Sequence, residues 1–405
     1  MKGFTIANDL HHIGARVIGA RLKGRTRDGV PAPKCHWFRI VSGGKIRIER
    51  VASRDGFEAF ARLPFAVYAD REAWWPPDTQ NETELLSGRA LIAAYLDLCP
   101  FCAWRDAKLV ARVSAVVNHR YNDHWKEKLG QLIHFEAMSG EEDAVAAMMD
   151  QALEWLAQRG MKAARSGFAA FLDYPYAIDN YNALPSFLLR GNPDFYHRYF
   201  KNARFLTEKG QVDYTAPLTP EILARYREML EAARRMGAVV KSWREYGFLA
   251  AVDVWTDVTN EAFSRHWGWN PITRDEVRPM LTPLGTTLAA DLSMVAILDD
   301  APVGAVFSVP DLSRALAQVR PGVRLKPERG GGTRGALVNI GVIERARSRG
   351  VARAMAARSF LTMAAHAMRF AGYTLVLDDN WPSRRTAESL GARVTGNFVT
   401  YRRDL

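Results

Sequence analysis

The sequence is poor in cysteine and has no long apolar run. Its 405 residues include three cysteines, Cys35, Cys99 and Cys102, too few for a disulfide framework in a chain of this size. No window approaches the ~18 to 20 consecutive apolar residues that a membrane-spanning helix needs. No charged segment followed by an apolar core opens the chain, as a secretion signal would require. We therefore expect a cytoplasmic protein whose contact with membranes, where it exists, is peripheral.

Most of the excess positive charge lies near the N-terminus, and little of it lies elsewhere in the chain. The formal net charge is +11, but the first 45 residues hold nine Lys and Arg against two Asp and contribute +7 of it. The remainder is close to neutral, which argues against a specific nucleic-acid-binding surface. We predict a basic N-terminal extension, residues 1–44. It either remains solvated or binds the anionic inner face of a membrane through a short helix that carries Leu10, Ile13 and Val17.

A repeated pattern follows this extension. Hydrophobic residues make up 48% and charged residues 24% of the chain, and the length suits two domains. Cys102–Ser114 has the pattern of a strand, a charged turn and a strand, and Val295–Ser308, about 190 residues later, repeats it. A strand and an amphipathic helix follow each time. We predict an α/β fold of two tandem modules, each a mixed, mainly antiparallel twisted sheet flanked by helices.

The spacing of these elements suggests where the modules meet. The predicted pairs of strand and helix are Leu132–Phe135 with 144–159, and Ala336–Val342 with 351–370. Between them, Thr207–Pro220 is polar and contains proline, which favours a linker. We therefore place the boundary near residue 212, so that the modules comprise residues 45–211 and 212–405.

The segment with the clearest chemistry is Val338–Ala352, which is predicted to run from a strand through a short turn into a helix. Arg347-x-x-Gly350-x-Ala352 falls where that helix begins. The unpaired N–H groups and positive dipole of a helix N-terminus attract anions, and small residues there allow a pyrophosphate to approach. Arg347 and Arg349 would add charge-assisted contacts to phosphate. Taken alone, the motif is equally compatible with close packing of the helix start.

The residues after this helix help to decide between an anion-binding motif and simple packing. A strand from Gly372 leads to the polar residues Asp378–Asn380, a second helix ends at Leu390-Gly391, and a last strand runs through Tyr401. This order resembles the GNAT superfamily of acyltransferases, whose cofactor-binding consensus is Gln/Arg-x-x-Gly-x-Gly/Ala. The residues that match in place are Arg347, Gly350, Ala352, Asn380 and Leu390-Gly391.

Over residues 45–405 the chain resembles more closely a bacterial group of tandem-GNAT proteins that includes ceramide synthases. The segments that carry this likeness are Asn260–Trp269, Pro310–Leu312, Asp379-Asn380, Ala387–Gly391, Asn122–His124 and Phe135-Glu136. The resemblance implies an N-acyltransferase that moves a long-chain acyl group from acyl-CoA to a lipidic amine, a sphingoid base. Two alternatives stay open: acetylation of a small polar amine with acetyl-CoA, and a non-catalytic protein that binds acyl-CoA.

The resemblance also implies a cofactor site. In this superfamily the strand before the cradle separates from its neighbour, and its backbone N–H groups receive the thioester. The residues expected to bind acyl-CoA are Ile340, Gly341, Val342, Arg347, Arg349, Gly350, Val351, Ala352 and Asn380.

Several residues could serve as the general base. Asp379 adjoins the strand end, although an Asp there also suits a helix cap. His266 titrates near neutrality and lies between aromatic residues, although a structural role is as compatible with that setting. Asp378 is a weaker candidate, and the spacing around His366 favours packing.

The proton donor to the leaving thiolate is a second open question. Many GNAT enzymes use a tyrosine in the last helix, and the matching residue here is Ala387. We name Tyr401, on the final strand, as the substitute, with a packed aromatic as the alternative.

The first module lacks a cofactor cradle. Its strand leads to Glu141, Glu142 and Asp143 around a helix start. Carboxylates there suit the helix dipole but repel a pyrophosphate. We expect this module to bind no cofactor and to support the second module or form one wall of an acceptor cleft.

Two further motifs carry less chemistry. Cys99 and Cys102 form a C-x-x-C without a second ligand pair, so we expect no metal site. The basic, glycine-rich loop Arg324–Arg334 lacks the Lys-Ser/Thr of a nucleotide-binding loop. We predict that this loop forms a flap beside the cofactor.

Overall fold

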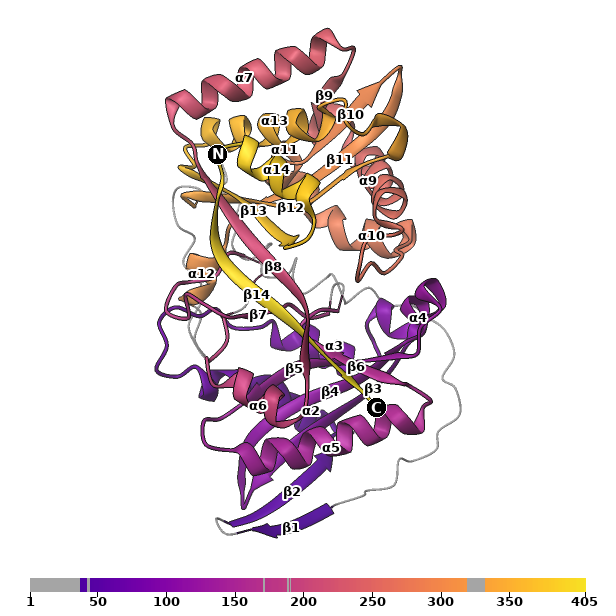
Figure 1. Ribbon diagram of the computed structural model, residues 1–405, viewed down its shortest axis with the longest axis vertical. Coiled ribbons are helices and arrows are strands. Elements are labelled where there is room, and N and C mark those ends of the chain that lie inside the picture. Colours follow the sequence, from indigo (N-terminus) through magenta and orange to yellow (C-terminus); the bar gives the residue numbers. More distant parts are fainter. Residues whose placement is uncertain (1–36, 42–43, 170–171, 188, 190, 319–331) are drawn as a thin grey trace.

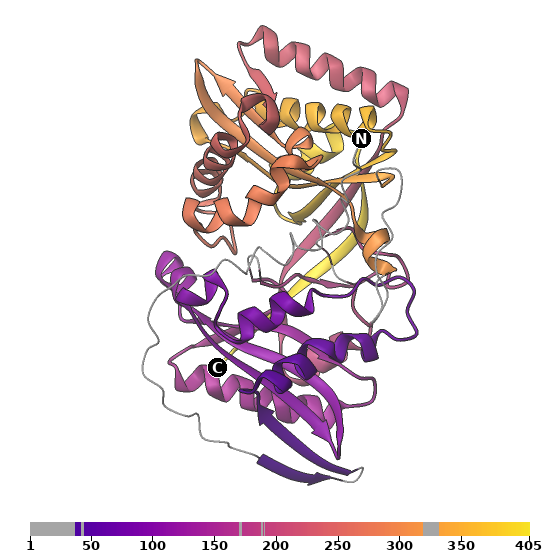
Figure 2. The same ribbon diagram turned by 180° about the vertical axis from the view of Figure 1, so that it is seen from behind.

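The computed structural model describes residues 37–41, 44–169, 172–187, 189, 191–318 and 332–405. The strands of this part form one sheet of 14, with helices packed on it (Figure 1; Figure 2, from behind). The strand order is β1-β2-β3-β4-β5-β6-β14-β8-β13-β12-β11-β10-β9, and β7 pairs with β14.

The strands are β1 (Trp37–Val41), β2 (Gly44–Arg50), β3 (Leu96–Arg105), β4 (Lys108–Asn118), β5 (Leu129–Ala137), β6 (Ala163–Ser166), β7 (Tyr176–Ala177), β8 (Leu206–Pro217), β9 (Val239–Ser242), β10 (Met294–Leu298), β11 (Ala301–Pro310), β12 (Arg334–Val342), β13 (Phe370–Leu377) and β14 (Arg393–Asp404). The helices are α2 (Arg54–Val67), α3 (Thr79–Leu86), α4 (His119–Trp125), α5 (Glu142–Gln158), α6 (Tyr196–Asn202), α7 (Pro220–Arg235), α8 (Trp243–Tyr246), α9 (Phe248–Phe263), α10 (Arg274–Leu281), α11 (Ala289–Leu292), α12 (Ser313–Ala317), α13 (Val351–Ala365) and α14 (Trp381–Ser389), with short 3-10 turns η1 (Leu91–Tyr95), η2 (Thr282–Thr286) and η3 (Glu344–Ala346).

The two halves of the sheet repeat one topology. Strands β2, β3, β4 and β5 are successive antiparallel neighbours, and α5 then leads to β6, which pairs parallel to β5. Strands β9 to β12, helix α13 and strand β13 follow the same order with the same directions. A parallel neighbour needs a crossover connection, here a helix. The predicted fold class, with its repeated order of hairpin, strand and helix, is confirmed.

Helix α13 begins and ends at residues in the left-handed conformation. Gly350 precedes it with φ of +74°, and Ala367 follows its C-cap, His366, with φ of +61°. The predicted continuation of this helix to Phe370 is therefore wrong, since Phe370 begins strand β13. The change of direction at Ala367 lets β13 return beside β12.

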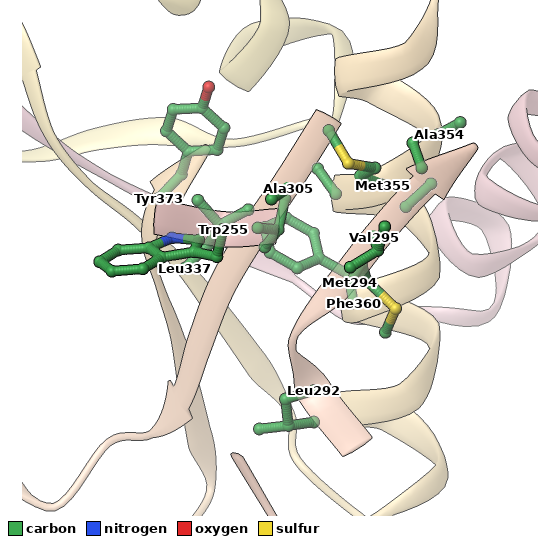
Figure 3. Close-up of a cluster of buried hydrophobic side chains, with 14 of the residues drawn as sticks. Trp255, Leu292, Met294, Val295, Ala305, Leu337, Ala354, Met355, Phe360 and Tyr373 are labelled. Carbon is green, nitrogen blue, oxygen red and sulfur yellow. The ribbon is translucent and has the colours of Figure 1, made fainter. Parts of the chain in front are cut away.

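Each half has its own hydrophobic cluster. In the C-terminal half, Figure 3 shows Ala354, Met355 and Phe360 of α13 beside Met294 and Val295 of β10. A Cβ on Gly335 of β12 would meet Met363 of α13, whereas one on Gly341 would meet Val258 of α9. Helices α13 and α9 therefore cover opposite faces of β12, because a bulge between these two glycines reverses the alternation of side chains.

The predicted linker is wrong. Thr207–Pro220 forms most of β8 and the first residue of α7, and β8 pairs with both β13 and β14. Figure 1 shows β8 and β14 running together from one half into the other. Polar Asp213 and Gln211 are buried in β8, which hides its alternating pattern of Val212, Tyr214 and Ala216. The halves are therefore joined by hydrogen-bonded strands.

Strand β14 also crosses the predicted module boundary. It pairs with β6 as well as with β8, and its Val399 and Tyr401 belong to the hydrophobic cluster of the N-terminal half. At the other end of the chain, β1 lies inside the predicted extension 1–44 and pairs with β2. The predicted membrane-binding helix near Leu10 lies outside the described residues.

Tyr401 provides a test of this crossing. Its ring stacks on Phe200 at 4.9 Å between centroids, and His197 Nδ1 lies 2.5 Å from its hydroxyl. Tyr401→Ala should lower the free energy of unfolding by about 3 kcal/mol, because a packed ring is lost. Tyr401→Phe should cost about 1 kcal/mol, the value of one hydrogen bond. Urea denaturation followed by circular dichroism measures both, and an Ala variant as stable as the natural protein would contradict the packing role.

Candidate functional site

The site begins where two parallel strands separate. Strands β12 and β13 pair only over Arg334–Leu337 and Phe370–Tyr373, although β12 continues to Val342 and β13 to Leu377. The register of β12 against β11 shifts at the same place, so that Val338 is the extra residue of a bulge. The bulge bends β12 away from β13, and the free edges of the two strands open into a cavity.

This cavity has a volume of about 1210 Å³, above the ~300 to 1,000 Å³ of ordinary small-molecule pockets. Most of its lining side chains are apolar or aromatic. The N-terminal half contributes Phe168, Asp173, Tyr174, Phe187 and Leu189, and the C-terminal half contributes residues of α9, α10, β11, β12, α13, β13 and α14 and of the 264–269 segment. The first half therefore forms one wall of the cavity.

The N-terminus of α13 opens into the cavity without a side-chain cap. Gly350 is its N-cap residue, and Gly350, Val351 and Ala352 all line the cavity. The first N–H groups of the helix have no intrahelical partner, so they can receive an anion such as a pyrophosphate. Arg347 also lines the cavity, where its guanidinium donates to the carbonyl oxygens of Val342 and Ala262 at 3.3 and 3.1 Å. Arg349 is exposed and is not a lining residue.

The other predicted cofactor residues lie around the same opening. Ile340, Gly341 and Val342 line it from the unpaired part of β12. A Cβ on Gly341 would lie 3.3 Å from the Cβ of Ala262, so glycine lets α9 approach this strand closely. Asn380 lines the cavity too, and its side chain caps α14 by accepting from the Ser383 N–H at 3.2 Å.

His266 and Asp379 are brought together, but only His266 reaches the cavity. The His266 Nδ1–H donates to the Trp267 carbonyl at 3.1 Å, which leaves the Nε2 lone pair available. Burial lowers the pKa of His266, and the nearby charge of Asp379 partly offsets this. Asp379 lies outside the lining, and its hydrogen bond with Lys209 lowers the pKa of its carboxyl. Of these two residues, only His266 therefore lies where it can contact a ligand in the cavity, and Asp379 acts on its pKa.

Three other candidates do not reach the cavity. Tyr401 lies in the hydrophobic cluster of the N-terminal half, and His366 is exposed at the opposite end of α13 from Gly350. Asp378 is exposed and is not a lining residue. Ala387, the residue in place of the family tyrosine, is completely buried and does not line the cavity either.

The sequence analysis did not predict a pair of hydroxyl-bearing residues that line the cavity. The Tyr373 hydroxyl lies 3.0 Å from the Ser383 hydroxyl, and both residues line the cavity. Tyr373 is the last residue of β13 that pairs with β12, so it lies where the strands part. Ser383 is one helical turn before Ala387 on α14, hence on the same helix face. The pair could be found only from the structure, which shows that these residues of β13 and α14 lie side by side.

A wall from the first half was one of the two roles predicted for that module, but the residues that form it were not predicted. Phe168 packs against Trp267 at 5.3 Å between ring centroids, and a Cβ on Gly268 would meet Phe168 at 2.6 Å. Phe168 and Phe187 belong to irregular segments, where no periodicity indicates which side chains face inward.

Helix α4 of the first half holds the segment that carries His266. His124 Nε2 lies 2.7 Å from the Ser264 carbonyl oxygen, and the Trp125 indole N–H donates to the Trp269 carbonyl at 2.8 Å. Arg120 forms two hydrogen bonds with Glu276 at 2.7 and 2.8 Å. The His266 imidazole is therefore positioned by both halves.

The two cysteines of the C-x-x-C lie on β3. Burial raises the pKa of Cys99 to about 11 and that of Cys102 to about 12, so both are protonated thiols at neutral pH. Within the described ranges, no three His, Cys, Asp or Glu side chains are grouped so that they could hold a metal ion. None of the described helices has the length and apolarity to span a bilayer. Of the predicted flap, residues 324–331 lie outside the described residues.

Comparison with known proteins identifies relatives at low identity. No family model matches the sequence. The chain is 18% identical to protein YghO of Escherichia coli (strain K12) over 280 residues, which are 66% of this chain and 69% of that protein. It is 22% identical over 266 residues to the bacterial ceramide synthase of Caulobacter vibrioides (strain NA1000 / CB15N), covering 64% and 69%.

A solved structure matches nearly the whole chain. It is a tandem GNAT protein from the clavulanic acid biosynthesis pathway, with a TM-score of 0.53 and 10% identity over 89% of this chain and 98% of that protein. At this identity the match establishes the fold, which agrees with the repeated topology and the separated strands described above. The chain therefore has the tandem GNAT fold.

Proposed function

We propose that this protein is an N-acyltransferase that moves a long-chain acyl group from acyl-CoA to a lipidic amine, with a sphingoid base as acceptor. The observation that carries the proposal is the cavity between β12 and β13, which combines an uncapped helix N-terminus with a long apolar and aromatic lining. Similarity to a bacterial ceramide synthase supports the acceptor class. The apolar lining favours a lipid over a small polar amine.

Acyl-CoA would bind as a substrate through the first turn of α13. The N–H groups after Gly350 would receive the pyrophosphate, and Arg347 would exchange its carbonyl contacts for phosphate oxygens. Arg349, exposed beside them, would contribute positive charge at the entrance. Backbone N–H groups of Ile340–Val342 would polarise the thioester carbonyl.

His266 would accept the proton that the amine loses. A lowered pKa keeps the imidazole neutral at pH 7, and its Nε2 is the acceptor. The amine nitrogen then forms a bond to the carbonyl carbon, the C–S bond breaks, and the thiolate of CoA leaves. The amine proton passes to His266, so the leaving thiolate requires a proton from another group.

The hydroxyl pair of Tyr373 and Ser383 would supply that proton. Burial raises the pKa of Tyr373 to about 12, so its hydroxyl is protonated at neutral pH. Both residues line the cavity. Tyr373 lies where β13 leaves β12, and Ser383 is on the face of α14 on which Ala387 lacks a hydroxyl. The basic residues 1–44 would hold the enzyme at an anionic membrane that contains the acceptor.

The first test is release of free thiol. Purified protein with palmitoyl-CoA and sphinganine should release CoA, and the double variant Arg347→Glu/Gly350→Glu should not, because two carboxylates would repel the pyrophosphate. Turnover confined to acetyl-CoA and a polyamine would favour the small-amine acetyltransferase. Calorimetric binding of palmitoyl-CoA without turnover on any amine would favour a non-catalytic binding protein.

A second test concerns His266. His266→Gln should lower kcat/KM by about a hundredfold or more. In the natural protein the rate should fall on acidification below pH 6.5, the ordinary pKa, because burial lowers the pKa of this group. Asp379→Asn should move that fall to lower pH, since the lost negative charge stabilised the imidazolium. His366→Gln is the control, because this histidine is exposed away from the cavity, and an unchanged acid limb in His266→Gln would refute the assignment.

A third test separates a proton donor from a packed aromatic. Tyr373→Phe should lower kcat about tenfold to a hundredfold with palmitoyl-CoA and leave KM for the thioester nearly unchanged. The loss should disappear with an aryl thioester, whose thiolate leaves without a proton. Tyr214→Phe is the matched control, since Tyr214 of β8 is the pairing partner of Tyr373 of β13 but does not line the cavity. Equal losses with both leaving groups would indicate a structural role.

A further inference from the structure

One amide side chain lies in the largely apolar wall that α9 forms with β12. Asn339 is on β12, two residues beyond the last pair with β13, and lines the cavity. Its Oδ1 accepts from the indole N–H of Trp255 at 3.1 Å and from the Thr259 hydroxyl at 3.4 Å. Since an indole N–H can only donate, Oδ1 must face Trp255, and the orientation of the amide is fixed.

The Nδ2 group of Asn339 is left without a hydrogen bond to any residue in the described part of the chain. Trp255 and Thr259 are buried, so the amide is held by a built arrangement rather than by solvent. The cavity lining nearby includes Phe307, the β11 partner of Asn339, and is mainly apolar. A donor in such surroundings gains most from an oxygen atom of a ligand, because little else there can accept.

We propose that Asn339 binds an oxygen atom of the acceptor close to its amine, so that the site selects amino alcohols and amino ketones over plain alkylamines. This inference rests on the proposed acyl transfer and names its acceptor class more narrowly. Side chains of a strand project out of the sheet, whereas backbone groups lie along its edges. The thioester contacts proposed for Ile340–Val342 use that edge, and Asn339 instead faces α9.

The position of Asn339 also places a bound oxygen near the reaction. It directly precedes the segment proposed to hold the thioester carbonyl, and α9, which fixes its amide, leads into the segment that carries His266. A sphingoid base carries hydroxyl groups on the carbons beside its amine and a long apolar chain. One of these hydroxyl oxygens would accept a hydrogen bond from Asn339 Nδ2. The alkyl chain of the base would lie against the apolar wall.

The test compares sphinganine with octadecylamine, which has the same chain length but no oxygen, in the same detergent. Binding to the protein saturated with CoA is measured by calorimetry, and kcat/KM is measured with palmitoyl-CoA. The natural protein should prefer sphinganine about tenfold to a hundredfold. Asn339→Leu, of similar size, should abolish the preference by weakening sphinganine alone. Thr256→Val should keep it, because Thr256 is buried on α9 but donates to the Val252 carbonyl and not to Asn339.

Several outcomes would overturn this assignment. Equal weakening of both amines in Asn339→Leu would mean that the amide contacts the thioester or only packs. Loss of preference in Thr256→Val equal to that in Asn339→Leu would also indicate packing. A natural protein that binds the two amines equally, or neither, would refute selection. Preferential binding of sphinganine without thiol release would support Asn339 while refuting the proposed transferase.

Discussion

The separation of β12 from β13 is the constraint on which the rest of the site depends. Parallel strands that continued side by side would satisfy each other's backbone groups and leave no opening. The bulge at Val338 ends the pairing after four residues, while packing of α13 and α9 on opposite faces keeps β12 in place. The energy lost in unpaired backbone groups is recoverable when a ligand supplies their partners.

The first half has the same topology, but different side chains lie at the corresponding place. Strands β5 and β6 also pair over only four residues. Beyond them, Glu136 of β5 accepts hydrogen bonds from the Tyr68 and Tyr196 hydroxyls at 2.9 and 2.7 Å. At the start of α5, Glu141 and Asp143 pair with Arg105. A carboxylate and aromatic hydroxyls thus lie beyond the paired part of β5, where the second half has the cavity lining of β12.

Two buried carboxylates link β12 to the wall segment of the N-terminal half. Arg334 of β12 forms ion pairs with Asp213 of β8 and Asp311, at 3.2 and 3.5 Å. Asp311 Oδ1 also accepts from the backbone N–H of Phe187, which lines the cavity. Burial raises the pKa of Asp213 to about 6 despite the guanidinium beside it. Charges buried at this depth are costly unless their partners stay in place, so the wall segment is tied to the strand that opens.

The sequence by itself predicted the repeated fold, the strand and helix around the cavity opening, and the glycine at the start of that helix. Those features rest on local pattern: alternation, helical period and a glycine at a helix start. Only the tertiary structure showed that the two halves share strands, because the buried polar residues Gln211 and Asp213 make the sequence of β8 look like that of a linker. It alone placed His266, Tyr373, Asn339 and Phe168 around one cavity, since they come from four separate segments. The tertiary structure also showed that Tyr401 lies away from the cavity, because β14 carries it into the N-terminal half. No local sequence pattern indicates where in space a strand ends.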